Sequence, residues 1–92
     1  MKLDYDPGKD AANVAKHGIA LADAMLVYEA PNKITLQTSR NDENRLMDVA
    51  WVASADMVLV LVYVVRGNVV RAISLRRAST IERRMYEKTQ QN

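Results

Sequence analysis

The sequence predicts a single domain of the α+β class, built around a small antiparallel sheet. Helix-capping residues mark the chain at residues 6–18 and again at 79–82. Between them, four segments rich in β-branched residues are separated by polar turns, and Gly67-Asn68 joins the last two. We expect the order β-α-α-β-β-β-β-α. All 92 residues are assigned to one domain, because a hydrophobic content of 49% is enough for one core.

The elements before the sheet have recognisable ends. Residues 2–5 are expected to form a short strand. Asp6 suits the N-cap of a helix that starts at Pro7, and Gly18 suits the left-handed residue that ends it after His17. A second helix is predicted for residues 21–29. Four of its residues recur at spacings of 3, 4 and 7 and so share one face: Leu21, Ala24, Met25 and Tyr28.

The last two strands form a predicted hairpin. Strands are expected at residues 34–37, 45–52, 57–65 and 69–76, with the segment SRNDEN between the first two. A two-residue connection with glycine first favours a type II′ turn, which pairs Arg66 with Val69. Antiparallel partners keep a constant index sum, so this register predicts the pairs Tyr63 with Ala72, Leu61 with Ser74 and Leu59 with Arg76. We therefore expect Tyr63, Ser74 and Arg76 on one face and Arg77 on the other.

The stretch ISLRRASTIERRMYE, residues 73–87, ends a strand and starts the last helix, where Ser79 and Glu82 match a capping box. Residues 1–65 carry six Lys and Arg against nine Asp and Glu, whereas residues 66–92 carry seven against two. This asymmetry favours an anionic ligand, most commonly nucleic acid, although a solvated basic helix gives the same pattern. We expect the arginines of the hairpin and the last helix to converge on one anion-sized pocket.

Composition excludes several classes of protein. The chain has no cysteine, which removes disulfides, thiolate metal sites and a cysteine nucleophile. The longest apolar run, residues 57–65, is too short to cross a membrane as a helix, and the acidic N-terminus does not resemble a signal peptide. We therefore expect a cytoplasmic protein with no membrane association. The single histidine argues against a metallonuclease, so we expect no cofactor and no metal, with an all-carboxylate magnesium site as the open alternative.

Several motifs together resemble one family. They are DPGK, NVAKHGI, AMLVY, ENR, the hairpin residues YVVRG, RAISLRRA and the ER-x-x-Y pattern that ends at Tyr86. On these residues the chain resembles the BrnT toxins, and the likeness extends from Leu3 to Tyr86. It implies a RelE-like fold and a toxin of a type II toxin–antitoxin module that cleaves RNA and arrests growth. The implied partner is a BrnA-like ribbon-helix-helix antitoxin, through which alone the toxin would contact DNA.

Some positions depart from the pattern of that family. Tyr5-Asp6 stands where tryptophan is frequent, Tyr28 replaces phenylalanine, and Ala50-Trp51 stands where glycine is common. A lone tryptophan on a strand is usually buried, so we expect Trp51 in the core, with a stacking plane for a base as the alternative.

Cleaving RNA without a metal requires a group to accept a proton, a group to supply one, and cations around the phosphate. Arg76 is the first choice for holding the scissile phosphate, with help from Arg45, Arg66 or Arg83. Tyr63 or Tyr86 would orient or protonate it. His17 is the one imidazole, although a residue that caps the helix C-terminus would look the same.

Other basic residues are candidate substrate contacts: Lys9, Arg71, Arg77 and Arg83. Lys9 and Arg45 are selected only by their match to the motifs of the family. The rival hypothesis is a non-catalytic module that uses the same basic surface to bind an antitoxin or a nucleic acid, because a groove that suits phosphate also suits carboxylates.

Overall fold

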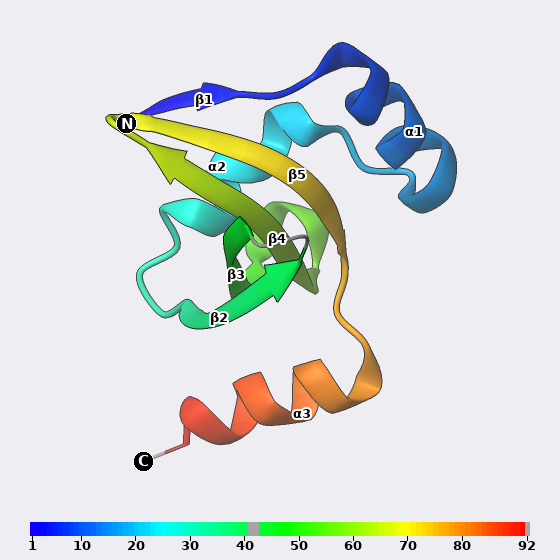
Figure 1. Cartoon of the computed structure of the whole chain (residues 1–92). Coiled ribbons are helices and arrows are strands. Elements are labelled where there is room, and N and C mark those ends of the chain that lie inside the picture. Colours follow the sequence, from blue (N-terminus) through cyan, green and yellow to red (C-terminus); the bar gives the residue numbers. More distant parts are fainter. Residues whose placement is uncertain (41–42, 92) are drawn as a thin grey trace.

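Five strands form one mixed sheet in the order β1-β5-β4-β3-β2 (Figure 1). The computed structural model describes residues 1–40 and 43–91. The strands are β1 (Lys2–Asp4), β2 (Ile34–Arg40), β3 (Glu43–Val52), β4 (Met57–Arg66) and β5 (Val69–Arg77). The helices are α1 (Pro7–His17), α2 (Ala24–Tyr28) and α3 (Thr80–Thr89), with single 3₁₀ turns η1 (Leu21–Asp23) and η2 (Ala53–Ala55).

The α+β class and the order of elements are confirmed, with two differences in detail. The sheet is mixed because β1 joins the edge of β5 in parallel, with Lys2 opposite Val69. The second predicted helix is divided into the 3₁₀ turn η1 and the short helix α2. The turn predicted in SRNDEN includes residues 41 and 42, which lie outside the described residues.

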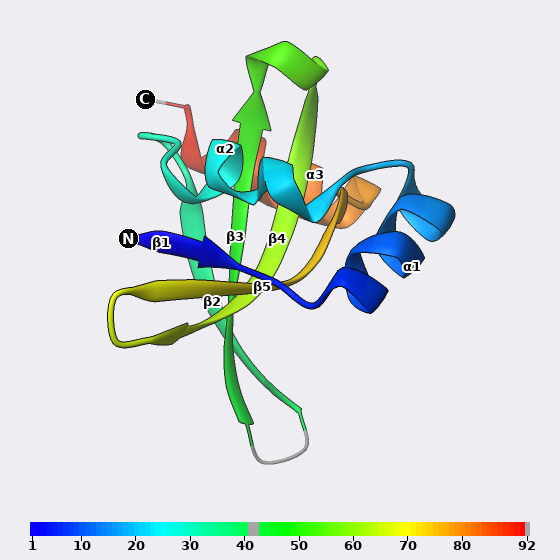
Figure 2. The same ribbon diagram turned by 90° about the horizontal axis from the view of Figure 1, so that it is seen from above.

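Helices cover both faces of the sheet. Figures 1 and 2 show α2 over one face of β3 and β4, α3 against the opposite face, and α1 beyond the β5 edge. On the α2 side, Tyr28 packs edge-on against Tyr63, with ring centroids 5.4 Å apart. The core contains Leu61, Leu75 and Val60, which are fully buried.

No helix in the described part of the chain is long and apolar enough to cross a membrane.

The predicted caps at the helix ends are confirmed. The Asp6 side chain accepts a hydrogen bond from the Gly8 amide at 2.7 Å. Gly18 ends α1 with a φ of 72°, a left-handed conformation that costs least at glycine. Ser79 and Glu82 form the capping box of α3 in both directions. These local signals fix where α1 and α3 begin.

A β-bulge in β5 changes the predicted register. The turn holds as expected, since Gly67 has a φ of 61°, Arg66 pairs with Val69 and Tyr63 pairs with Ala72. The register then shifts, so that Val62 faces Ser74, and Ile73 is the extra residue. Three further pairs follow the bulge: Leu61 with Leu75, Val60 with Arg76 and Leu59 with Arg77.

The bulge decides which residues share a face. Beyond it, Ser74 and Arg76 lie beside Val62 and Val60, whereas Tyr63 points to the other side of the sheet. The prediction that Tyr63, Ser74 and Arg76 share a face is therefore wrong. The prediction that Arg76 and Arg77 lie on opposite faces follows from alternation and holds, because β5 stays extended through Arg77.

Candidate functional site

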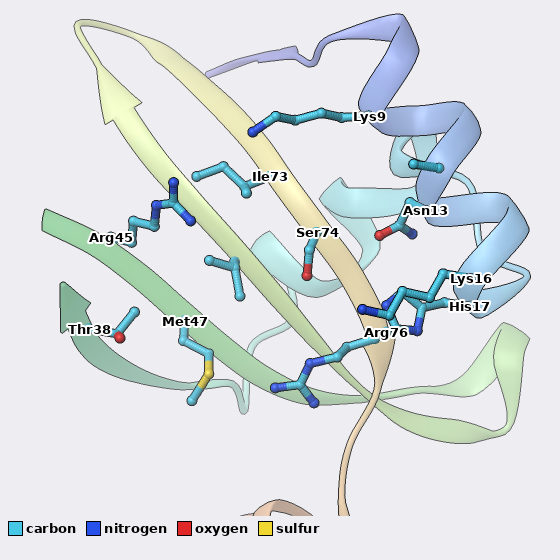
Figure 3. A pocket seen from close by; sticks show the side chains of 12 residues that line it. Lys9, Asn13, Lys16, His17, Thr38, Arg45, Met47, Ile73, Ser74 and Arg76 are labelled. Carbon is cyan, nitrogen blue, oxygen red and sulfur yellow. The ribbon is translucent and has the colours of Figure 1, made fainter. Parts of the chain in front are cut away.

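A cleft of about 480 Å³ lies between α1 and one face of the sheet (Figure 3). Helix α1 contributes one wall, and the strands β2 to β5 contribute the floor and the far side. The lining residues are Lys9, Ala12, Asn13, Lys16, His17, Thr38, Arg45, Met47, Val62, Ile73, Ser74 and Arg76. The bulge at Ile73 is what brings Ser74 and Arg76 to this face.

The cleft is cationic. Among the described residues that line it are two lysines, two arginines and His17, and there is no carboxylate. No ion pair of Lys9 or Lys16 is found within residues 1–40 and 43–91. Cations without a neutralising partner attract anions most strongly when low-dielectric walls surround them. The arrangement therefore suits a phosphate or another anion.

Arg76 is bound by the carboxylate of Glu82, in the first turn of α3. Its two terminal nitrogens donate to the two oxygens of Glu82 at 2.7 and 2.9 Å, and Nη1 also donates to the Arg77 carbonyl oxygen at 3.3 Å. The bond to Arg76 is the main cause that lowers the pKa of Glu82 to about 2, and the same pair raises the pKa of Arg76. Of the five N–H donors of a guanidinium, these bonds use three, and the other two have no acceptor within the described part of the chain.

The guanidinium of Arg45 has more N–H donors available to a ligand than that of Arg76. Its Nε donates to Glu43 at 3.1 Å, which leaves the four N–H groups of its terminal nitrogens without a protein acceptor among the described residues. Its side chain is only 18% exposed, so these donors sit inside the cleft. The free end of this guanidinium can hold a phosphate in bidentate fashion. The predicted substrate contact at Arg45 is thus placed in the cleft.

Asn13 fixes α1 against the sheet. Its side-chain amide donates to the carbonyl oxygens of Ile19 and Leu75, both at 2.7 Å, and its oxygen accepts from the Leu75 amide at 3.1 Å. β1 pairs with β5 only as far as Arg71, so Asn13 takes over the backbone groups of β5 that β1 does not reach. The side chain is buried, which makes these bonds costly to lose. Asn13 thereby sets the position of the α1 cations over the cleft.

Tyr63 lies outside the cleft, in a buried network on the opposite face. It is 2% exposed, and its hydroxyl donates to Asp48 at 3.0 Å. Burial, followed by the Asp48 charge, raises the pKa of Tyr63. Asp48 is fully buried and also accepts from Lys33 and Thr35, both at 2.7 Å. Tyr63 therefore belongs to a satisfied structural network.

The remaining candidates do not converge on one pocket, so the expectation of a hairpin and last-helix arginine cluster is wrong. Arg66 pairs with Glu43 at 3.2 Å and Arg71 pairs with Asp4. Arg77 and Arg83 line a separate pocket together with Trp51, and the Tyr86 side chain of α3 is buried. The alternation of strand residues and the bulge send these side chains in different directions.

Of the ten candidates taken from the sequence, the structure brings four to the cleft: Lys9, His17, Arg45 and Arg76. Lys16 was not selected. The sequence does contain a pattern that indicates Lys16, because Lys9, Asn13 and Lys16 follow the helical spacing i, i+4 and i+7 and so share one face of α1.

Trp51 is 46% exposed, so the expectation of a core tryptophan is wrong. The described residues contain no cluster of three or more His, Cys, Asp or Glu side chains arranged to hold a metal ion.

Comparison with known proteins identifies the family. No curated protein matches the chain. A family model described as ribonuclease toxin, BrnT, of type II toxin-antitoxin system matches residues 5–82, which include every residue that lines the cleft. The match spans far more than half of the 92 residues. The chain therefore belongs to the BrnT family of ribonuclease toxins of type II toxin–antitoxin systems.

Proposed function

We propose that this ribonuclease toxin is an endoribonuclease that cleaves RNA without a metal ion, and that the phosphate reacts at the end of the cleft where Lys16, His17 and Arg76 lie. The observation that carries the proposal is the meeting of the imidazole with two cations in one cleft (Figure 3). A phosphate held there is neutralised from two sides, by α1 and by β5. The same geometry leaves room for a sugar over the apolar floor.

The reaction is an internal transfer. The 2′-oxygen attacks the adjacent phosphorus, and its proton passes to the His17 imidazole, since imidazole accepts and donates protons near neutral pH. Arg76 and Lys16 balance the extra negative charge of the five-coordinate phosphorus. The bond to the 5′-oxygen then breaks, and that oxygen takes a proton from the imidazolium or from the Lys16 ammonium. The products are a 2′,3′-cyclic phosphate and a free 5′-hydroxyl.

The ion pair with Glu82 fixes the orientation in which the Arg76 guanidinium meets a phosphate. Because both ends of the guanidinium are bound to Glu82, the plane of Arg76 is fixed before a ligand arrives, and the ligand meets the two remaining N–H groups. A preorganised cation needs little rearrangement when charge develops on the phosphate, and one such donor contributes about 3 kcal/mol to transition-state binding. Lys16 brings a compact charge on a flexible stem from the opposite wall.

The test uses purified protein, a labelled single-stranded RNA and an excess of EDTA. Cleavage should continue in EDTA and yield a cyclic phosphate. His17→Gln and Arg76→Lys should each lower the rate about 100-fold or more. Arg84→Lys is the matched control, because Arg84 is an exposed arginine of α3 outside the cleft, and it should cleave like the parent. Loss of cleavage in EDTA, or two cleft variants with unchanged rates, would contradict the proposal.

A toxin of a type II module has an antitoxin partner. We infer that this partner is a ribbon-helix-helix protein, that DNA is contacted only through it, and that the toxin acts on RNA in the cytoplasm. The cationic cleft supports an acidic antitoxin segment, since carboxylates fit where phosphate fits. Co-purification with the product of an adjacent reading frame tests the pairing. Operator DNA should shift with the complex and not with the toxin alone.

A further inference from the structure

The cations of the cleft form two groups separated along the sheet. In the register of the sheet, Arg45 of β3 lies opposite Thr38 of β2. Arg76 of β5 lies opposite Val60 of β4, which in turn lies opposite Val49 of β3. From Arg45 to Val49 the chain advances four residues along β3, which is about 13 Å at the rise of a strand. The two arginines of the cleft therefore project from sites well apart, one at each end.

The lysines of α1 repeat this separation. Lys9 and Lys16 are seven residues apart, about 10 Å along the helix axis. Asn13, between them, is bound to Leu75 next to Arg76, which anchors the middle of α1 beside β5. Figure 3 shows Lys9 extending over the Arg45 end, while Lys16 and His17 lie at the Arg76 end. Each end of the cleft thus has one arginine and one lysine from opposite walls.

The floor between the two ends is apolar. It consists of Met47, Val62 and Ile73, all only partly buried, with the hydroxyl of Ser74 beside them. Met47 and Val62 also pack against the core. An apolar surface inside a cationic cleft is unfavourable in water and favourable under a flat base. Met47 lies opposite Val62, and Val62 lies opposite Ser74. This level of the sheet is midway between the levels of Arg45 and Arg76.

We propose that the cleft binds an unpaired stretch of RNA through two phosphates, one at each end, with the base between them on the apolar floor. The Arg76 end holds the reacting phosphate, so this inference rests on the proposed function. The Lys9–Arg45 end is an anchoring subsite for a neighbouring phosphate, because the terminal nitrogens of Arg45 have no acceptor in residues 1–40 and 43–91 and can make a bidentate contact. In an A-form duplex the bases face one another, and no base face can reach the floor.

Binding is measured with a fluorescent RNA hexamer that carries 2′-O-methyl groups, so that cleavage and binding are separated. The single strand should bind at least about tenfold more tightly than the same strand in a duplex, as stacking of one base on the floor would give. Raising the salt should weaken binding. Arg45→Gln and Lys9→Gln should each reduce the salt slope by about one, and Arg84→Gln should leave it unchanged.

A second measurement isolates the anchoring subsite. A 2′-O-methyl dinucleotide with one internal phosphate is compared with the same dinucleotide carrying an added terminal phosphate, at the 5′ or the 3′ end. The parent protein should bind one of the two phosphorylated forms about tenfold more tightly than the unphosphorylated form. Arg45→Gln should abolish that preference, and Arg84→Gln, outside the cleft, should keep it.

The outcomes separate this inference from the proposed function. If unmodified RNA is not cleaved but the 2′-O-methyl strands behave as stated, the catalytic proposal fails and the two-phosphate site stands. If duplex and single strand bind equally, the site described here is wrong, whether or not cleavage occurs. The same holds if Arg45→Gln keeps the preference for the added phosphate.

Discussion

Replacing Glu82 by glutamine removes the charge that holds Arg76 and keeps an oxygen that can still cap α3. The carboxylate has an ordinary pKa of 4.5, and in the folded chain the pKa of Glu82 falls to about 2. At about 1.4 kcal/mol per pH unit, this shift corresponds to at most about 3 kcal/mol of folding free energy. The Glu82 and Arg76 side chains are 17% and 30% exposed, so solvent screens the pair only moderately.

The sign of the pH dependence follows from the direction of the shift. Because the folded pKa of Glu82 is depressed, the stabilisation is complete above pH 4.5 and is lost as the pH falls through about 2. Glu82→Gln should therefore lower the free energy of unfolding by about 2 to 3 kcal/mol at pH 6, and by much less near pH 2. Urea unfolding followed by circular dichroism at a series of pH values measures both.

Glu87→Gln is the control on the same helix. Its side chain is 60% exposed and its carboxylate lies 4.0 Å from Arg83, so the loss of this charge should change stability by no more than about 0.5 kcal/mol. If the cost of Glu82→Gln stays constant between pH 6 and pH 2, the charge of Glu82 is not the source of the stabilisation, and the account of the pair given above is refuted.

Three further changes test other parts of the fold. Asp48→Asn removes the charge that faces Lys33 in the buried network and should cost about 3 kcal/mol, measured by thermal unfolding; an unchanged midpoint would show that the network contributes nothing. Ser79→Ala removes the N-cap of α3 and should cost about 1 kcal/mol in urea unfolding, with RNA binding to the cleft retained. Gly18→Ala should cost about 1 kcal/mol because of the left-handed backbone there, since no atom blocks the added methyl group; a neutral result would exclude backbone strain at this site.

The local parts of the fold could be predicted because neighbouring residues determine them. The caps at Asp6, Gly18 and Ser79 and the turn at Gly67 depend on short-range geometry and agree with the structure. The parallel pairing of β1 with β5 depends on contacts between distant segments, which the residues of a three-residue strand do not encode.

The site was predictable only in part, because a single extra residue in β5 determines which of the following side chains face the cleft. The hairpin register was right up to Tyr63 and Ala72, and the bulge at Ile73 then exchanged the faces of Ser74 and Leu75. No glycine or proline marks this bulge in the sequence. Arg76 was selected for its position in a basic segment, whereas Lys16 became significant only when Asn13 placed α1 along the cleft.

The contact of Asn13 with β5 has a consequence for assembly. Beyond Arg71, the outer edge of β5 is paired with a side chain instead of a strand, and a side chain can be displaced without unfolding the sheet. A polypeptide that added itself to this edge as a new strand would compete with Asn13 for the amide and carbonyl of Leu75. Its arrival would release α1, and both lysines would leave the cleft together. Strand addition at this edge would thus inactivate the toxin by removing the α1 wall of the cleft.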